Sequence, residues 1–216
     1  MQCIALAGNP NSGKTTLFNA LTGLRYKVAN YPGVTVERKK GKIRLSADLE
    51  ATLVDLPGIY SLIGTSIDEK IATSVLLGEI PSEPVPDCVV VVVDSSNLER
   101  NLYLATQLID CGLPLVIALN MIDLAEKRGI TVHNQLLSRF LDVPVVSVVA
   151  NKGIGLDALR GEIQRALATK NISSRRFAWS EAEKIFRDTA LKLGNSYLNA
   201  EHKADSRSAI ILGLAS

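Results

Sequence analysis

The sequence predicts an α/β fold, with a mostly parallel sheet, one antiparallel edge strand and a small helical subdomain at the C-terminal end. Three observations predict it. Short apolar runs rich in β-branched residues alternate with amphipathic stretches of helical spacing, as in a sheet covered on both faces. A glycine-rich turn separates the first apolar run from the first amphipathic stretch. After Thr169 no further β-rich run follows.

The expected parallel strands are Cys3–Ala7, Ala51–Leu56, Cys88–Val93, Leu115–Leu119 and Val145–Val149. The expected helices are Lys14–Thr22, Asp68–Leu77, Leu98–Ile109, Gln135–Phe140 and Leu156–Leu167. Arg38–Leu45 is also expected to be a strand, but its basic run places it at an edge, with a solvated face. Strand and helix alternation implies right-handed crossovers, and ligands bind such sheets at the carboxyl ends of the strands.

The domain boundary is expected near residue 168, giving an α/β domain over 1–168 and a helical subdomain over 169–216. A Ser/Glu capping box in Trp179–Glu183 and the helical spacing after it support the second unit. The chain stops at Ser216 soon after the apolar run Ile210–Leu212, so we expect a piece of a longer protein, with a natural end as the alternative.

Composition is that of a folded chain, because 47% of the 216 residues are apolar and 21% are charged. A net charge of +2 gives no strong global attraction to nucleic acid or anionic lipid. The three cysteines form no CxxC pair, which favours reduced, buried thiols in a cytosolic compartment. No apolar run approaches the roughly 20 residues that span a bilayer, and no signal peptide is evident, so we expect a soluble chain.

The segment Gly8–Thr15 matches G-x-x-x-x-G-K-[ST], and it follows a predicted strand and opens a predicted helix. Its glycines let backbone N–H groups wrap phosphates. Lys14 supplies charge to the β and γ phosphates, and the Thr15 hydroxyl is a hard ligand for Mg²⁺. The alternative is an ordinary glycine turn with an exposed lysine. The expected phosphate-binding residues are Gly8, Asn9, Pro10, Asn11, Ser12, Gly13, Lys14, Thr15 and Thr16.

Two further segments indicate metal and γ-phosphate contacts. Asp55 ends a predicted strand and can reach Mg²⁺ through water, while Gly58 can offer an N–H to the γ-phosphate. Thr35, in a loop with Gly33 and Val34, can complete the Mg²⁺ shell when the γ-phosphate is present. Their alternatives are a strand-ending turn and a β-favouring surface threonine.

The segment Asn120–Asp123 resembles the base-reading N-K-x-D motif, with Met121 in place of the lysine. The Asp123 carboxylate can accept hydrogen bonds from N1–H and the N2 amino group of guanine, which adenine lacks. This favours GTP and GDP over adenine nucleotides. Val149 and Ala150 stand where such domains often have Ser-Ala, and the Ala150 N–H could meet guanine O6. The alternative for Asn120 and Asp123 is ordinary helix capping.

With these motifs the chain resembles the cytosolic N-terminal G domain of the bacterial ferrous iron transporter FeoB family. The matching stretches are GNPNSGKTTLFNAL, YPGVTVERK, TLVDLPGIYS, DSSNLERNLYL and ALNMIDLAE. The resemblance implies a P-loop G domain that hydrolyses GTP to GDP and phosphate. It also implies that this domain regulates Fe²⁺ uptake through a membrane permease domain of the same polypeptide. The G domain would then lie at the cytoplasmic face of the bacterial inner membrane. It implies that the tail is a spacer, or GDI-like, subdomain.

Two positions bear on mechanism. Ile59 stands where many small GTPases carry a water-positioning glutamine, so we expect slow intrinsic hydrolysis. The family resembles K⁺-activated GTPases in which a P-loop asparagine helps to hold K⁺, and Asn11 occupies that place. The alternative interpretation of Asn11 is a turn residue whose side chain bonds to its own loop. The expected catalytic residues are Lys14, Thr35, Gly58 and Asn11.

No iron site is expected in this chain, because His133 and His202 are isolated in sequence. Two alternatives remain open: a regulatory switch in which nucleotide occupancy matters more than turnover, and an RNA-binding ribosome-assembly GTPase. The second would need a further basic domain, so no nucleic-acid partner is expected. Self-association is a further interaction to be tested.

Overall fold

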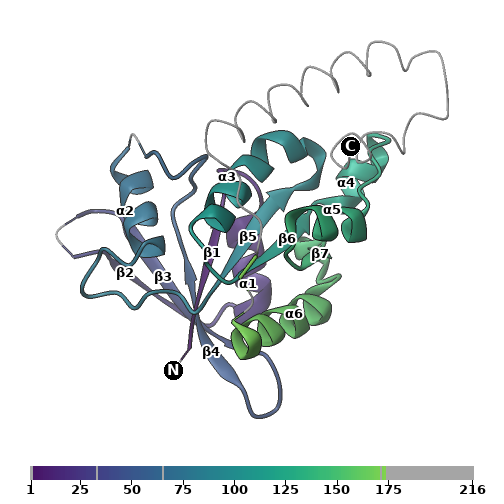
Figure 1. The fold of residues 1–216 in the computed structure, drawn as a ribbon. Coiled ribbons are helices and arrows are strands. Elements are labelled where there is room, and N and C mark those ends of the chain that lie inside the picture. Colours follow the sequence, from purple (N-terminus) through teal and green to yellow (C-terminus); the bar gives the residue numbers. More distant parts are fainter. Residues whose placement is uncertain (1, 33, 65, 171, 174–216) are drawn as a thin grey trace.

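The computed structural model describes residues 2–32, 34–64, 66–170 and 172–173, which form a seven-stranded sheet with helices on both faces (Figure 1). The strands are β1 (Cys3–Gly8), β2 (Tyr26–Asn30), β3 (Glu37–Arg44), β4 (Glu50–Asp55), β5 (Cys88–Asp94), β6 (Leu115–Asn120) and β7 (Val145–Ser147). The helices are α1 (Lys14–Thr22), α2 (Ile67–Leu76), α3 (Leu98–Asp110), α4 (Ile122–Lys127), α5 (Asn134–Leu141) and α6 (Leu156–Thr169), with short 3₁₀ turns at Ser95–Asn97 and Ala150–Lys152.

The sheet has the order β2-β3-β4-β1-β5-β6-β7. β1 pairs in parallel with β4 and β5, and β6 and β7 continue in parallel. β3 runs antiparallel to both β2 and β4. The α/β fold with a mostly parallel sheet and an antiparallel strand at one edge is therefore confirmed.

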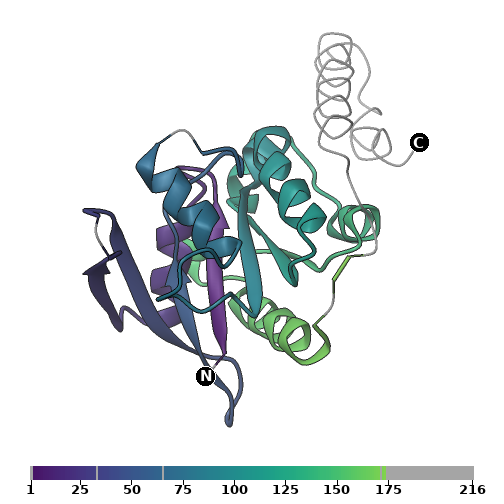
Figure 2. The same ribbon diagram turned by 60° about the vertical axis from the view of Figure 1, so that its left-hand side comes forward.

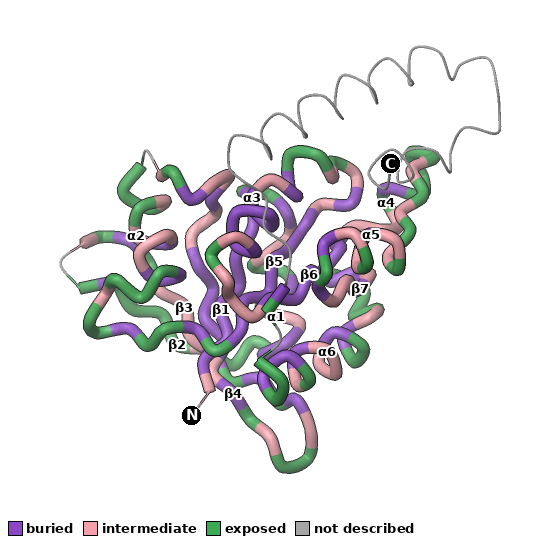
Figure 3. Tube along the Cα trace, in the orientation of Figure 1, coloured by how far each residue is buried: buried purple, intermediate pink, exposed green. Residues whose placement is uncertain are grey.

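The prediction that Arg38–Leu45 is itself the outermost strand is wrong in one respect, because β2 pairs outside it. β2 was not predicted from the sequence. Four of its five residues are exposed, so it lacks the apolar alternation that marks a half-buried strand (Figure 3). α4 was also missed, since its six residues are too few to show a helical period.

The core has two layers because side chains of successive strand residues point to opposite faces. Alternate residues of β1 and β5 pack with α2, α3 and α5 on one face. The residues between them, such as Ile4 and Val90, pack with Phe18 of α1 and Ile163 of α6 on the other face (Figures 1 and 2). Burial on both faces explains why β1 and β5 are continuous apolar runs.

The basic face of β3 is less solvated than the sequence predicts. Glu83, in the connection between α2 and β5, has a side chain only 2% exposed and pairs with both Arg38 and Lys40. Lys40 Nζ lies 2.7 Å from Glu83 Oε2. A nearly buried carboxylate is stable only when it is paired, so these cations hold the connection against the sheet. Lys42 and Arg44 instead pair with the exposed Glu50.

The proposed helical subdomain, including the capping box at Trp179–Glu183, lies outside the described residues except at its start, and it remains a prediction. In the described part of the chain, no helix has the length and apolar character needed to cross a membrane.

Candidate functional site

The phosphate loop joins the end of β1 to the start of α1, as the motif predicts. Gly13 has a φ of +83°, and a Cβ there would lie 2.2 Å from Nδ2 of Asn120. The glycine is thus required both by its left-handed backbone and by the close approach of β6. The N-terminal end of α1 points its free N–H groups into the loop, which favours phosphate binding.

Lys14, Thr15 and Asp55 converge although 40 residues separate Thr15 from Asp55. Lys14 Nζ lies 2.9 Å from Asp55 Oδ1, and the Thr15 hydroxyl donates to Asp55 Oδ2 over 3.1 Å. Asp55 is 6% exposed and Thr15 is exposed, so the pair faces a cleft of about 490 Å³. A hydroxyl and a carboxylate this close are hard oxygen donors that suit Mg²⁺.

One of the expected switch residues, Thr35, borders the same cleft. Thr35 is exposed and lines it, whereas Val34 is half buried against the core and donates its N–H to the Tyr31 carbonyl over 3.2 Å. Gly33 lies outside the described residues. Gly58 packs on the phosphate loop, since a Cβ there would lie 3.0 Å from the Pro10 nitrogen. The structure therefore brings the loop of Thr35 and the turn of Gly58 to the phosphate side of the sheet.

Ile59 is fully buried, and its N–H donates to the Gly8 carbonyl over 3.1 Å. Its side chain belongs to the core and does not face the cleft. A buried aliphatic group cannot orient an attacking water, and slow hydrolysis stays a prediction.

Asn9 and Asn11 have different surroundings within the phosphate loop. Asn9 is 3% exposed and donates from Nδ2 to the Arg100 carbonyl over 3.1 Å. Asn11 is exposed with a φ of 65°, and within the described residues its side chain makes no hydrogen bond. The alternative in which Asn11 serves only to bond its own loop therefore has no support in this geometry.

The base-reading residues surround a second hollow of about 310 Å³, between the C-terminal end of β6 and the N-terminal end of α1. Asn120 is 3% exposed; its Nδ2 donates to the Ser12 carbonyl over 3.0 Å, and its Oδ1 accepts the Ala150 N–H over 3.1 Å. It thereby ties the phosphate loop to the 149–153 loop. Met121, with a φ of 59°, turns the chain into α4 and lines the hollow.

Asp123 lines the hollow and forms an ion pair that the sequence did not reveal. Lys152 Nζ lies 2.6 Å from Asp123 Oδ2. The hydrogen bond from Lys152 lowers the pKa of Asp123 below its ordinary value, so the carboxylate is ionised at neutral pH. The Ala150 N–H, expected near guanine O6, donates here to Asn120, and Val149 N–H pairs with the Ile154 carbonyl.

Residues 2–163 match the family described as Ferrous iron transport protein B. The chain belongs to this family. It is 50% identical over 173 residues to the Fe(2+) transporter FeoB of Escherichia coli K12 and, to the same extent, to that of Salmonella typhimurium LT2. Each alignment covers 78% of this chain and 22% of the relative, so the chain spans about a fifth of the length of these transporters.

Solved FeoB structures agree with the fold. A mutant of S. thermophilus NFeoB bound to GDP is 38% identical, with a TM-score of 0.74 over 100% of this chain and 88% of the other. The cytosolic domain of T. maritima FeoB in GMPPNP form is 39% identical, with a TM-score of 0.75 over 87% and 75% of the two chains. This chain is thus a FeoB N-terminal G domain, which is a GTPase domain.

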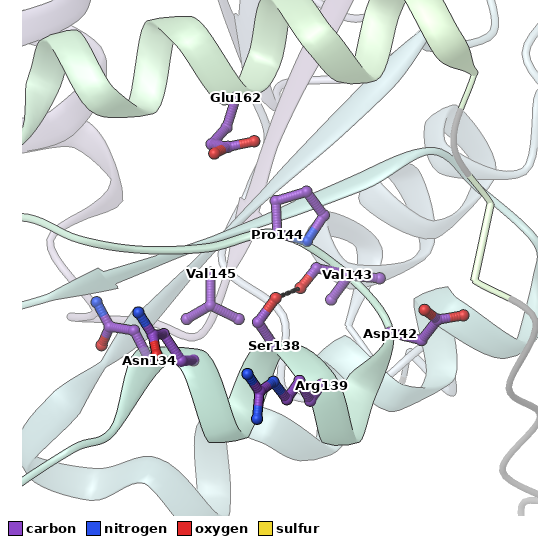
Figure 4. A pocket seen from close by; sticks show the side chains of 9 residues that line it. Asn134, Ser138, Arg139, Asp142, Val143, Pro144, Val145 and Glu162 are labelled. Carbon is purple, nitrogen blue, oxygen red and sulfur yellow. Dashed lines mark hydrogen bonds between the residues drawn. The ribbon is translucent and has the colours of Figure 1, made fainter.

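A further hollow of this FeoB G domain, about 470 Å³, lies between α5, the start of β7 and α6 (Figure 4). Ser138 donates to the Val143 carbonyl over 2.7 Å beneath it, and Glu162 faces it from α6 (Figure 4). It lies at the amino end of β7, whereas ligands of such sheets bind at the carboxyl ends. We assign no part of the nucleotide chemistry to it.

Proposed function

We propose that this G domain binds GTP with Mg²⁺ and hydrolyses it to GDP and phosphate. The observation that carries the proposal is the convergence of Lys14, Thr15 and Asp55 at the cleft between the phosphate loop and Thr35. Thr15 and Thr35 would hold Mg²⁺ directly and Asp55 through water. The ion would supply charge to the β and γ phosphates, as in other P-loop GTPases.

The remaining site residues have separate roles in the proposal. Lys14 and the backbone of the phosphate loop bind the phosphates, and Gly58 offers its N–H to the γ-phosphate. Asp123 accepts the N1–H and N2 amino group of guanine, while Asn120 holds the two loops around the base. The GDP and GMPPNP forms of the related FeoB structures support a guanine nucleotide as ligand.

We further propose that K⁺ stimulates the reaction through Asn11. Its side chain is exposed on the phosphate loop, with no hydrogen-bond partner in the described part of the chain. Its amide oxygen is thus available to a monovalent cation, whose charge would offset that of the transition state. Ile59 is buried and aliphatic, so it can neither orient the attacking water nor contribute charge, and in this proposal the cation supplies the charge compensation.

For the whole protein, we propose a G domain over 1–168 and a helical spacer over 169–216 that couples it to a membrane permease domain. The FeoB relatives, described as Fe(2+) transporters, support regulation of ferrous iron uptake at the cytoplasmic face of the bacterial inner membrane. Self-association belongs to the proposal and is testable by the dependence of turnover on protein concentration. No group of three or more His, Cys, Asp or Glu that could hold a metal occurs among the described residues, and the absence of an iron site stays a prediction.

The burial of Ile59 also favours a second candidate function, in which nucleotide occupancy, and not turnover, is the signal. Single-turnover GTP hydrolysis with Mg²⁺ in KCl and in NaCl separates the two. Faster hydrolysis in KCl, lost in Asn11→Ala, supports the enzyme. Equal rates in the two salts would remove the K⁺ proposal, and no hydrolysis in either would favour the occupancy switch.

The metal assignment is tested by Asp55→Asn, with the exposed Asp48→Asn as a matched control. Asp55→Asn should weaken the Mg²⁺ dependence of GTP binding and slow turnover, whereas Asp48→Asn should behave like the wild type. If the Mg²⁺ titration of Asp55→Asn matched that of the control, the role of Asp55 would be refuted.

A further inference from the structure

The ion pair between Asp123 and Lys152 involves the carboxylate that reads the base. Lys152 Nζ lies 2.6 Å from Asp123 Oδ2, which is a short, charge-assisted contact. The Lys152 side chain is 52% exposed, and that of Asp123, which lines the hollow, is 31% exposed, so both reach the solvent.

The backbone around Lys152 holds it in reach of this carboxylate. The Val149 N–H donates to the Ile154 carbonyl over 3.0 Å, and the Lys152 N–H donates to the Val149 carbonyl over 3.0 Å, closing a tight turn. Asn120 anchors the same turn by accepting the Ala150 N–H. These backbone hydrogen bonds fix the turn in a position from which the Lys152 ammonium reaches Asp123, shortly after the end of β6.

Guanine and Lys152 need the same acceptor. The base offers its N1–H and N2 amino group to the two oxygens of one carboxylate. An ammonium bonded to Oδ2 takes one acceptor site of that oxygen and offsets the negative charge that strengthens both hydrogen bonds to the base. Lys152 is on a flexible four-carbon stem and is half exposed, so it can leave into water when the base arrives.

We propose that Lys152 is an affinity-determining residue that competes with guanine for Asp123 and so speeds the release of GDP. The inference rests on the base-reading role of Asp123 given under the proposed function. Exposed ion pairs are weak, so removing this competition should tighten GDP binding only about two- to five-fold.

The direct test measures release of a fluorescent N-methylanthraniloyl GDP from the 216-residue chain. Lys152→Met should slow release about two- to five-fold, and Lys152→Arg, which keeps the cation, should restore the wild-type rate. Lys27→Met is the matched control: Lys27 is exposed on β2, does not line the hollow and makes no ion pair within the described residues, so its loss should leave release unchanged. Release from Lys152→Met that equals or exceeds the wild-type rate would overturn the proposal.

A double-mutant cycle separates this inference from the proposed function. Asp123→Asn should weaken GDP and favour xanthosine diphosphate, and in that background Lys152→Met should no longer slow release of the xanthine nucleotide. If Asp123→Asn weakens GDP while Lys152→Met has no effect on GDP release, the competition is refuted and the base-reading role stands. If Asp123→Asn leaves GDP binding unchanged, both are refuted.

Discussion

Asn120 should stabilise the fold even before it meets a nucleotide, because it links loops that are far apart in the chain. Replacing it with alanine removes the acceptor of the Ala150 N–H and the donor to the Ser12 carbonyl. Ser12 is 1% exposed and Ala150 is 5% exposed, so water cannot readily replace either bond. At about 1–3 kcal/mol for each of the two buried groups left without a partner, Asn120→Ala should lower the free energy of unfolding by about 2–6 kcal/mol.

Urea unfolding followed by circular dichroism, in buffer without nucleotide, measures this loss. The matched control is Asn134→Ala, whose amide exchanges hydrogen bonds of 2.8 and 3.0 Å with the Ser147 hydroxyl. Both of these side chains are only half buried, so the hydroxyl can turn to water, and the cost should be about 0.5–1.5 kcal/mol. Asn120→Ala should therefore be clearly less stable than Asn134→Ala. Equal stabilities, or a loss below about 0.5 kcal/mol in Asn120→Ala, would refute the reasoning.

Burial, charge and backbone geometry give three further predictions. Glu83→Gln, which leaves two cations of β3 without a charged partner, should cost about 1–3 kcal/mol in urea unfolding, and more than Glu50→Gln at an exposed pair. A thiol reagent should modify one cysteine of the native protein, the exposed Cys111, and all three cysteines after unfolding. Because desolvation raises the pKa of Cys111, its labelling should be slow at neutral pH and should accelerate as the pH rises. Gly13→Ala should abolish nucleotide binding measured by calorimetry, since the added Cβ would lie 2.2 Å from the Asn120 amide nitrogen. Gly129 has a similar φ but open space around the added Cβ, so Gly129→Ala should lower the free energy of unfolding by only about 1–2 kcal/mol.

Features encoded in short segments could be predicted from the sequence. The phosphate loop is a local turn whose glycines and following helix lie within a few residues of one another, and the structure has it where the motif predicts. The parallel strands and their helices were also predictable, since burial on both faces leaves continuous apolar runs and helical periods. Because parallel strands end at the same edge of the sheet, the motifs at those ends could be expected to meet.

Features that depend on neighbours distant in the sequence could not be predicted. β2 is a strand because it pairs with β3, and its mostly exposed residues show no apolar alternation. Glu83 lies 45 residues from Arg38, and no local pattern marks it as the buried partner of a basic strand.

The sequence by itself determined that this protein has the motifs of a guanine-nucleotide site at the ends of a mostly parallel sheet. Only the tertiary structure decided how those motifs are joined. Asn120 and Ser12 are 108 residues apart, and Lys152 and Asp123 are 29 apart, yet each pair is in hydrogen-bond contact. The physical reason is that residue type and local period fix which segments form strands and turns, whereas side-chain partners depend on which strand ends the topology places side by side.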